Sequence, residues 1–354
     1  MRELIERHRR FWAGEGPCLL LVPAAEVPLY DTQSYDRLFA EPRLMWESEM
    51  RRARVVVGWP TDGIPTVRPN LGVIFCPSIA GQGYQVKSDQ MPWPGEPLPI
   101  EGIRAARGVD AAAAVLMRRA EAFYRIHRES GVADVVAYHP DTQGVFDVAH
   151  LLYGDGIFTA MAGEEDEQRL VFEIMDVALE VYLRATRRIK EMLGEAAGSM
   201  IHGHGGPQGV FFPEGGVRIS EDTPTLLSPA MIDRFVMPWI ERSLEPFSGG
   251  FAHFCGRHPP FFERLCRCPL VKAIDLGNPE SYDPAWLLGR CAAAGTVLWS
   301  RLAALPGETG EAHVRRIGGL VRESGARVIL RSSVAPRDRG EAERMLALWR
   351  DLTG

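Results

Sequence analysis

The sequence lacks any apolar run long enough to cross a membrane. A transmembrane helix needs roughly 20 consecutive apolar residues, and runs such as 18–22 are far shorter. The start of the chain mixes acidic and basic side chains and contains no apolar stretch of the kind found in signal peptides. We therefore expect a cytoplasmic protein with no membrane partner.

The sequence also lacks an excess of positive charge and is poor in cysteine. Its 40 Lys and Arg residues against 46 Asp and Glu residues give a formal net charge of -6. Binding to a phosphate backbone needs a basic face, so nucleic acid is not an expected partner. Six cysteines in 354 residues are expected to be free thiols, because a chain of this length can bury a large core without disulfides.

Short apolar segments alternate with amphipathic helical segments along the whole chain. Helix 164–193 is the clearest, with apolar residues at helical spacing, acids in its first turn and Gly194 after its end. The other predicted helices are 33–52, 109–130, 229–247, 260–267, 284–294, 310–324 and 339–352. The predicted strands are 17–23, 54–58, 133–138, 199–203, 249–255, 271–276, 296–300 and 327–331.

Strands that alternate with helices predict a parallel sheet, since parallel strands need crossover connections. Eight such units fill a (β/α)8 TIM barrel. We expect one α/β barrel domain over 1–354, with an extra N-terminal helix and long loops, such as 60–99, over the C-terminal mouth. An open doubly wound sheet is the alternative. In a barrel the chemistry lies where strands end and loops begin, at the C-terminal mouth.

The segment 250–256 contains the sharpest candidate site. Side chains alternate along a strand, so His253 and Cys255 share a face. An imidazole and a thiolate placed in this way can supply two ligands of a tetrahedral zinc site. A packed strand end without metal is the alternative.

A pair of histidines follows the same pattern in 200–206. His202 and His204 are expected to share a face, on a strand that neighbours the one carrying His253. Four potential metal ligands, His202, His204, His253 and Cys255, would then converge. Hydrogen bonding of the two histidines to substrate or to loop backbone is the alternative.

Carboxylates also follow predicted strands. Asp62 and Asp141 each stand in a loop after a strand, where a carboxylate can position a substrate or carry a proton. Capping of a turn is the other interpretation of each. His139, at the end of the third predicted strand, is expected to bind the substrate together with Gln143 and Glu221.

Three segments resemble the uroporphyrinogen decarboxylase superfamily: 141–149, 219–222 with 227–229, and 253–256. That superfamily also contains zinc-dependent methyltransferases that act with corrinoid proteins, such as methylcobalamin:coenzyme M methyltransferases. The resemblance runs through most of the chain in the same order. It implies a (β/α)8 barrel with its site in the C-terminal mouth.

The resemblance also implies a zinc site at His253 and Cys255. The methyltransferases carry a further cysteine after the last strand, but the matching segment 331–336 has none, and Val334 stands where sulfur is expected. Because zinc sites usually need three or four protein ligands, three alternatives stay open. His202 or His204 supplies the missing ligand, Glu221 supplies it, or the site has lost its metal and His253 acts as an acid or base.

The absence of arginines near the first predicted strand argues against one reaction of the superfamily, decarboxylation of a polyacidic substrate. The decarboxylases bind substrate carboxylates with arginines at the first strand, and here no arginine occurs between Arg10 and Arg37. The resemblance therefore favours methyl transfer between a small substrate and a corrinoid. The expected catalytic residues are Asp62, Asp141 and His253. The corrinoid would come from a partner protein docked on 60–99, because the chain has no Asp-x-His-x-x-Gly motif. A cofactor-free decarboxylase and a non-catalytic corrinoid- or porphyrin-binding barrel are the alternatives, and a homodimer is a further expectation.

Overall fold

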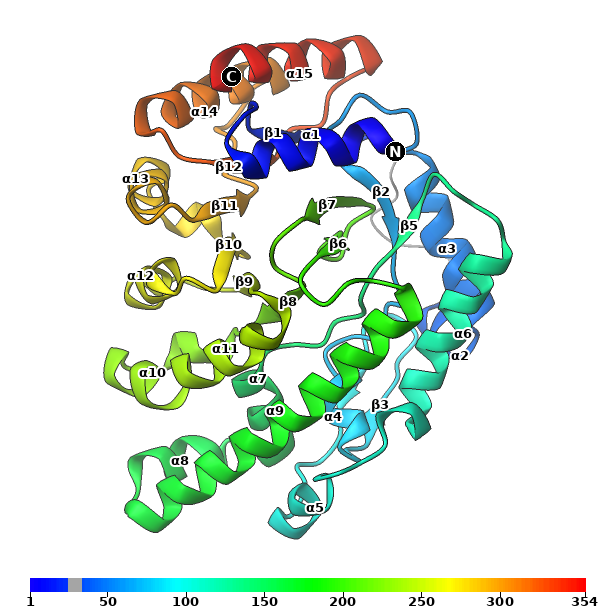
Figure 1. Ribbon diagram of the computed structural model, residues 1–354, viewed down its shortest axis with the longest axis vertical. Helices are drawn as coiled ribbons and strands as arrows, with labels where there is room; N and C mark the ends of the chain where they lie inside the picture. Colours follow the sequence, from blue (N-terminus) through cyan, green and yellow to red (C-terminus); the bar gives the residue numbers. More distant parts are fainter. Residues whose placement is uncertain (25–33) are drawn as a thin grey trace.

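Six parallel strands form one continuous sheet, at the centre of a ring of helices (Figure 1). The computed structural model describes residues 1–24 and 34–354. Nearly every residue of the six strands is buried, as in parallel sheets covered on both faces. In sheet order these strands are β1 (Leu19–Leu21), β12 (Val328–Arg331), β11 (Val297–Ser300), β10 (Val271–Leu276), β9 (Gly250–Phe254) and β8 (Val217–Ser220).

A second sheet lies beside the first. Its order is β5 (Val136–Ala137), β2 (Ile64–Val67), β7 (Gln208–Phe212) and β6 (Met200–His202). β2 and β5 are parallel, whereas β7 runs antiparallel to both β2 and β6. A separate hairpin pairs β3 (Tyr84–Gln85) with β4 (Trp93–Pro94).

Backbone hydrogen bonds tie the segment before β2 and the segment after β5 to β1 and β8, the two edge strands of the first sheet. Asp62 N donates to Leu20 O over 2.9 Å, and Gly144 N donates to Ser220 O over 2.6 Å. The structure confirms an α/β fold with a parallel sheet. The single closed sheet of eight strands stays a prediction, because regular strand pairing is divided between the two sheets.

Helices cover the outside of the sheets, and α1 is the expected N-terminal helix (Figure 1). Trp12 of α1 donates its indole N–H to Phe211 O on β7 over 2.7 Å, which fixes α1 against the second sheet. The helices are α1 (Arg2–Ala13), α2 (Tyr35–Ala40), α3 (Pro42–Arg54), α4 (Phe75–Ile79), α5 (Ile100–Ala105), α6 (Val115–Glu129), α7 (Val145–Tyr153), α8 (Gly156–Ala162), α9 (Glu165–Leu193), α10 (Pro229–Phe235), α11 (Met237–Leu244), α12 (Pro259–Arg267), α13 (Pro284–Ala294), α14 (Gly310–Ser324) and α15 (Arg339–Thr353).

The helix predicted at 164–193 is confirmed as α9. Glu164 and Glu167 form a reciprocal capping box at its start, and Gly194 ends it in the left-handed conformation at φ 68°. Three other predicted helices are shorter or divided. Prolines at the first turns of α3 and α11 separate them from α2 and α10, since proline cannot continue a preceding helix. The segment 109–130 reduces to a 3₁₀ turn and α6, and residue 33, the predicted start of 33–52, lies outside the described residues.

The strand predicted at 54–58 is wrong. These residues end α3 and form the turn after it, and only Val56 of the three valines is buried. A strand inside a parallel sheet would bury both faces. The strand of this region is β2, which lies inside the segment 60–99 that was predicted to be a loop.

The adjacency predicted for 199–203 is also wrong. These residues do contain a strand, β6, but it forms an antiparallel hairpin with β7 and does not pair with β9. The parallel neighbours of β9 are β10 and β8, and of these two β8 was not among the predicted strands. It was not predicted because Arg218 and Ser220 give it a polar appearance, although both side chains are buried.

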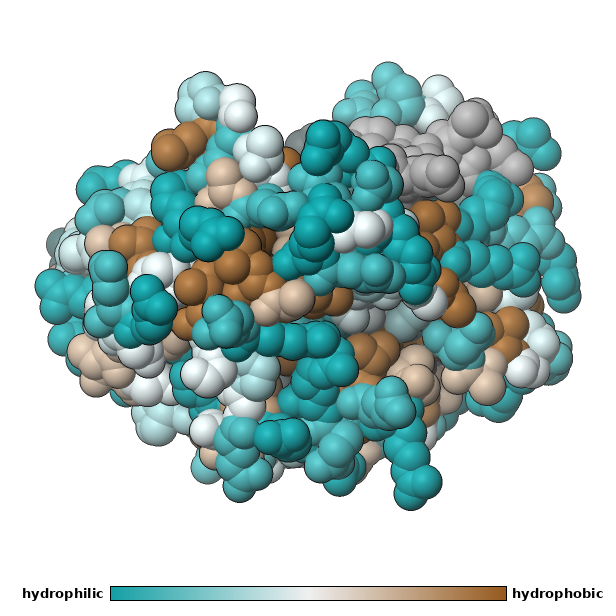
Figure 2. All heavy atoms as spheres, turned by 90° about the horizontal axis from the view of Figure 1, so that it is seen from above, coloured by the Kyte–Doolittle hydropathy of each residue, from teal (hydrophilic) through white to brown (hydrophobic). Residues whose placement is uncertain are grey.

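Within the described residues, no helix has the length and apolar character that a membrane crossing requires. The face that carries α14 and α15 is mostly hydrophilic, with hydrophobic residues in small separate groups (Figure 2).

Candidate functional site

β9 and the residue that follows it bring His253 and Cys255 together. His253 lies opposite Asp275 of β10 and Ser220 of β8 in the strand register. The Cys255 sulfur is 3.5 Å from His253 Nε2. Gly277 leaves the space for that sulfur, because a Cβ at this position would stand 2.4 Å from it. The predicted convergence of an imidazole and a thiol is therefore present.

Asp275 fixes the orientation of the His253 ring. The fully buried carboxylate is hydrogen-bonded to His253 Nδ1, lies 2.9 Å from His204 Nε2 and forms an ion pair with Arg331. Burial alone would raise the pKa of Asp275, but Arg331 and the two imidazoles hold it well below its usual value. An ionised carboxylate on Nδ1 leaves Nε2 of His253 as the free nitrogen facing Cys255.

Asp222 completes the group on the Cys255 side of the ring. Its Oδ1 accepts a hydrogen bond from Cys255 N at 2.6 Å and lies 3.8 Å from His253 Nε2. The ligand atoms of Asp222, His253 and Cys255 all lie within 4.8 Å of one another. Asp147 of α7 holds this segment in place by accepting hydrogen bonds from the backbone N–H groups of Asp222 and Thr223 at 2.8 and 2.9 Å.

The surroundings of Cys255 oppose ionisation of its thiol. Burial and the neighbouring Asp222 carboxylate raise the pKa of Cys255 to about 12. The thiol is therefore neutral near pH 7 unless a cation offsets this negative environment. Aromatic rings pack against the neighbouring His204: Phe251 and Trp299 both contact it, and Phe251 packs on Phe212 and Trp299 with ring centroids 5.3 and 4.9 Å apart.

The two histidines of the β6–β7 hairpin have different positions. His204 lies in the turn at φ 44°, with its ring centroid 4.4 Å from that of His253. Burial lowers the pKa of His204 to about 3 despite its contact with Asp275. His202 Nδ1 accepts a hydrogen bond from His204 N at 3.0 Å, and its ring packs against Tyr138 and Phe251. The turn takes His204 off the strand, yet the two imidazole rings lie 6.3 Å apart and both pack against Phe251. Among the described residues, His202 belongs to neither group of potential metal ligands.

Two groups of potential ligands share His253 through opposite ring nitrogens. His204, His253 and Asp275 form one group, and hydrogen bonds already join them. Arg331 forms an ion pair with the Asp275 carboxylate of this group. A guanidinium there repels a cation. The group of Asp222, His253 and Cys255 offers oxygen, nitrogen and sulfur at a partly exposed position, which fits the ligand preference of zinc with one position open.

Asp141 is the carboxylate that interacts with two buried arginines, Arg218 and Arg68. It pairs with Arg218 of β8, and Gln143 Nε2 donates to it over 2.7 Å. Burial opposes ionisation of Asp141, but Arg218 and Arg68 outweigh it and lower its pKa. Arg68, at the end of β2, is buried and donates to Asn70 Oδ1 over 3.2 Å, and it forms no ion pair with a carboxylate among residues 1–24 and 34–354. Burial opposes the charge of Arg68, but Tyr138, Asp141 and Glu49 raise its pKa above the ordinary value, so Asp141 is a countercharge shared by Arg68 and Arg218.

Two other predicted residues, His139 and Glu221, have structural partners. His139 Nε2 lies 2.7 Å from Glu195 Oε2, which also pairs with Lys190. Glu221 is buried and accepts the backbone N–H groups of Phe146 and Asp147 at 3.2 and 3.1 Å, so it caps α7. It belongs to neither group of potential metal ligands.

The predicted location of Asp62 is wrong. It precedes β2 instead of following a strand, and its carboxylate is 1% exposed. Arg7 and Arg350 donate to its Oδ1 at 2.7 and 2.8 Å, and Leu20 N donates to Oδ2 at 3.0 Å. With its oxygens engaged at the start of the strands, Asp62 ties α1 and α15 to the sheet and does not reach His253.

Sequence reasoning missed Asp222, Asp275 and Arg331. Asp222 directly follows Glu221, a predicted site residue. Asp275 and Arg331 are charged residues near the ends of largely apolar strands. A charge in such a position must be paired when buried, which is the signal that could have identified both.

No protein-family model matches the sequence, and no curated protein matches it. A solved structure, described as a methyltransferase from Methanosarcina mazei, is similar to this chain with a TM-score of 0.66 and 16% sequence identity. The similarity covers 98% of each chain. At this identity the likeness establishes that the two proteins share a fold along nearly their whole length.

Proposed function

We propose that this protein is a methyltransferase of the corrinoid-linked type, with Zn²⁺ held by Asp222, His253 and Cys255. The observation that carries the proposal is the convergence of these three donor atoms on the side of the His253 ring opposite Asp275. Asp222 takes the place of the missing cysteine. The likeness in fold to a methyltransferase supports the same interpretation.

Bound zinc would supply a Lewis acid that stabilises a thiolate or polarises a substrate oxygen in the open fourth position. The residues of the chain prepare for it. Asp275 keeps the proton on Nδ1 of His253, so that Nε2 presents its lone pair. Cys255 must lose its proton on binding, because its pKa of about 12 keeps it neutral otherwise.

The small substrate is proposed to carry an anionic group. Arg68 and Arg218 are both buried, and together they have Asp141 as their shared carboxylate partner. An anionic substrate group could form the direct ion pair that Arg68 does not form with any carboxylate among the described residues. We also propose that the two sheets act as one barrel wall around this group.

The methyl donor or acceptor is proposed to be a corrinoid on a partner protein. In the direction of substrate methylation, the Co–C bond breaks, a bond forms between the methyl carbon and the deprotonated substrate, and the electron pair stays on cobalt. The partner would dock at the β3–β4 hairpin, which exposes apolar side chains, with Met91 40% and Trp93 57% exposed.

The first experiment measures zinc in purified protein and in the His253→Ala variant. We expect about one zinc per chain in the wild type and a loss in the variant. His127→Ala is the matched control, because this histidine lies on α6 and is bonded to the backbone of Val135. Equal zinc in the wild type and His253→Ala would refute the metal site.

The second experiment mixes the zinc-loaded protein with free methylcobalamin and a thiol carrying an anionic group. The absorbance of methylcobalamin should change with time, and the change should be lost in Cys255→Ala. Carbon dioxide release from a small acid without cobalt would instead favour a decarboxylase.

A further inference from the structure

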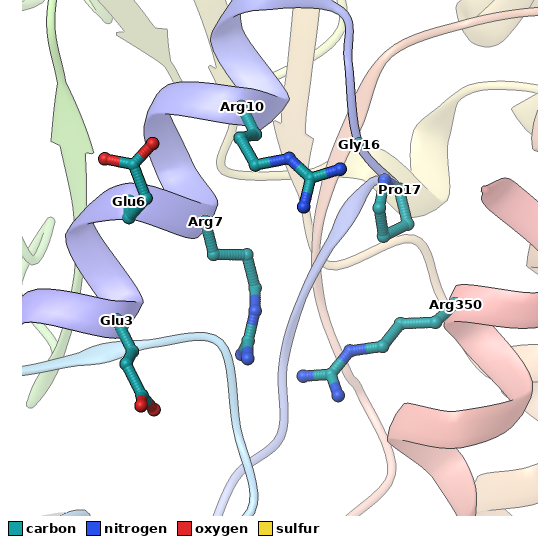
Figure 3. A pocket seen from close by; sticks show the side chains of 7 residues that line it. All are labelled: Glu3, Glu6, Arg7, Arg10, Gly16, Pro17 and Arg350. Carbon is teal, nitrogen blue, oxygen red and sulfur yellow. The ribbon is translucent and has the colours of Figure 1, made fainter.

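A cavity lined by several charged residues lies at the opposite end of the strands from Cys255. It has a volume of about 470 Å³ and lies between α1, α15 and the segment that enters β1 (Figure 3). Gly16 and Pro17 of its lining precede β1, whereas Cys255 follows β9. The lining residues are Glu3, Glu6, Arg7, Arg10, Gly16, Pro17 and Arg350.

Two arginines of this cavity are held in place by one buried carboxylate. Arg7 of α1 and Arg350 of α15 each donate one N–H to the same oxygen of Asp62, at 2.7 and 2.8 Å. A guanidinium carries five N–H donors, so most donors of both groups are left for other acceptors. Arg350 Nε is buried and has no hydrogen-bond partner in the described part of the chain.

A third guanidinium points into the same space. Figure 3 shows Arg10 extending between α1 and Pro17 toward the gap that separates Arg7 from Arg350. The carboxylates of Glu3 and Glu6 turn away from Arg350, and neither forms an ion pair with an arginine among the residues described. Three guanidinium groups thus line this cavity. Arg7 and Arg350 share the Asp62 carboxylate, whereas Arg10 donates to the backbone oxygen of Glu15 over 3.1 Å.

We propose that this cavity is a binding site for the phosphoryl group of a small ligand. A phosphoryl group offers several charged oxygens, which suits donors arriving from two helices, and arginine matches phosphate geometry with paired N–H donors. Asp62 prepares the site, since it holds two of the guanidinium groups in position before any ligand arrives. The site is independent of the chemistry proposed at His253.

Calorimetric titration of the full chain with inorganic phosphate tests this proposal, with acetate at the same ionic strength as the comparison anion. We expect saturable binding of one phosphate per chain and at least about tenfold weaker binding of acetate. Arg10→Gln should weaken phosphate binding by about tenfold, the effect of losing charged hydrogen bonds. Arg10 is the best variant because it does not touch Asp62.

Arg2→Gln is the matched control, because it removes the same charge from α1 but does not line the cavity. Its phosphate affinity should equal that of the wild type. A thermal-shift series provides a second readout: phosphate should raise the melting temperature of the wild type and Arg2→Gln more than that of Arg10→Gln. The proposal is overturned if phosphate does not saturate, if acetate binds equally well, or if both variants weaken binding equally.

Discussion

The reactivity of Cys255 toward an alkylating reagent is a direct test of the site's electrostatics. In metal-free protein, burial and Asp222 raise the pKa of this thiol from 9.0 to about 12. At pH 8 the thiolate fraction then falls by about 1,000-fold relative to an ordinary thiol. A more basic thiolate is also a better nucleophile, with a Brønsted slope of about 0.4–0.5, so the net slowing is about 30- to 60-fold.

The assay is alkylation by iodoacetamide after removal of metal, followed by mass spectrometry of the peptide that contains Cys255. All six cysteines lie in the described residues and Cys255 alone is exposed, so Cys255→Ser should leave almost no reaction in the native protein. The rate should rise steadily from pH 7 to pH 10 without a plateau. Asp222→Asn should accelerate alkylation, because it removes a negative charge that keeps the thiol neutral.

A plateau below pH 9, or a rate at pH 8 equal to that of free cysteine, would refute the electrostatic explanation. Either result would mean that the thiolate is stabilised without a metal, and the thiol would then need no cation in order to ionise.

Three further predictions concern buried carboxylates. Asp275→Asn should lower zinc affinity by about 10- to 100-fold, because His253 loses its orienting partner; competition with a chromophoric chelator measures this, and unchanged affinity would contradict it. Asp62→Ala should lower the free energy of unfolding, measured by urea titration, by about 3 kcal/mol. This value is the lower end for a broken buried ion pair, because Arg7 and Arg350 are about one-third exposed. A loss under about 1 kcal/mol would count against a structural role for Asp62. Burial and the neighbouring Asp147 raise the pKa of Glu221 well above its usual value, so the native state holds an extra proton and stability should fall as the pH rises above about 4.5. Between pH 5 and pH 8, the free energy of unfolding measured by urea titration should fall less for Glu221→Gln than for the wild type. An equal fall in both proteins would exclude Glu221 as the source of the pH dependence.

Local patterns of the sequence determined the elements that depend on near neighbours. Helix α9 could be predicted because its apolar spacing, its acidic first turn and Gly194 all lie within one segment. The buried position of His253 beside Cys255 followed from side-chain alternation on β9, a short-range property of any strand.

Tertiary structure alone decided which side chains meet at His253. Asp275 comes from the next strand of the sheet, Asp222 from the end of β8, and His204 from a hairpin turn that no strand-by-strand pattern could place. β8 itself was hidden, because its buried Arg218 has a partner, Asp141, that lies 77 positions away in the chain. Charges are tolerated inside a protein when a distant partner neutralises them, and a linear sequence does not show which distant residues will be close in space.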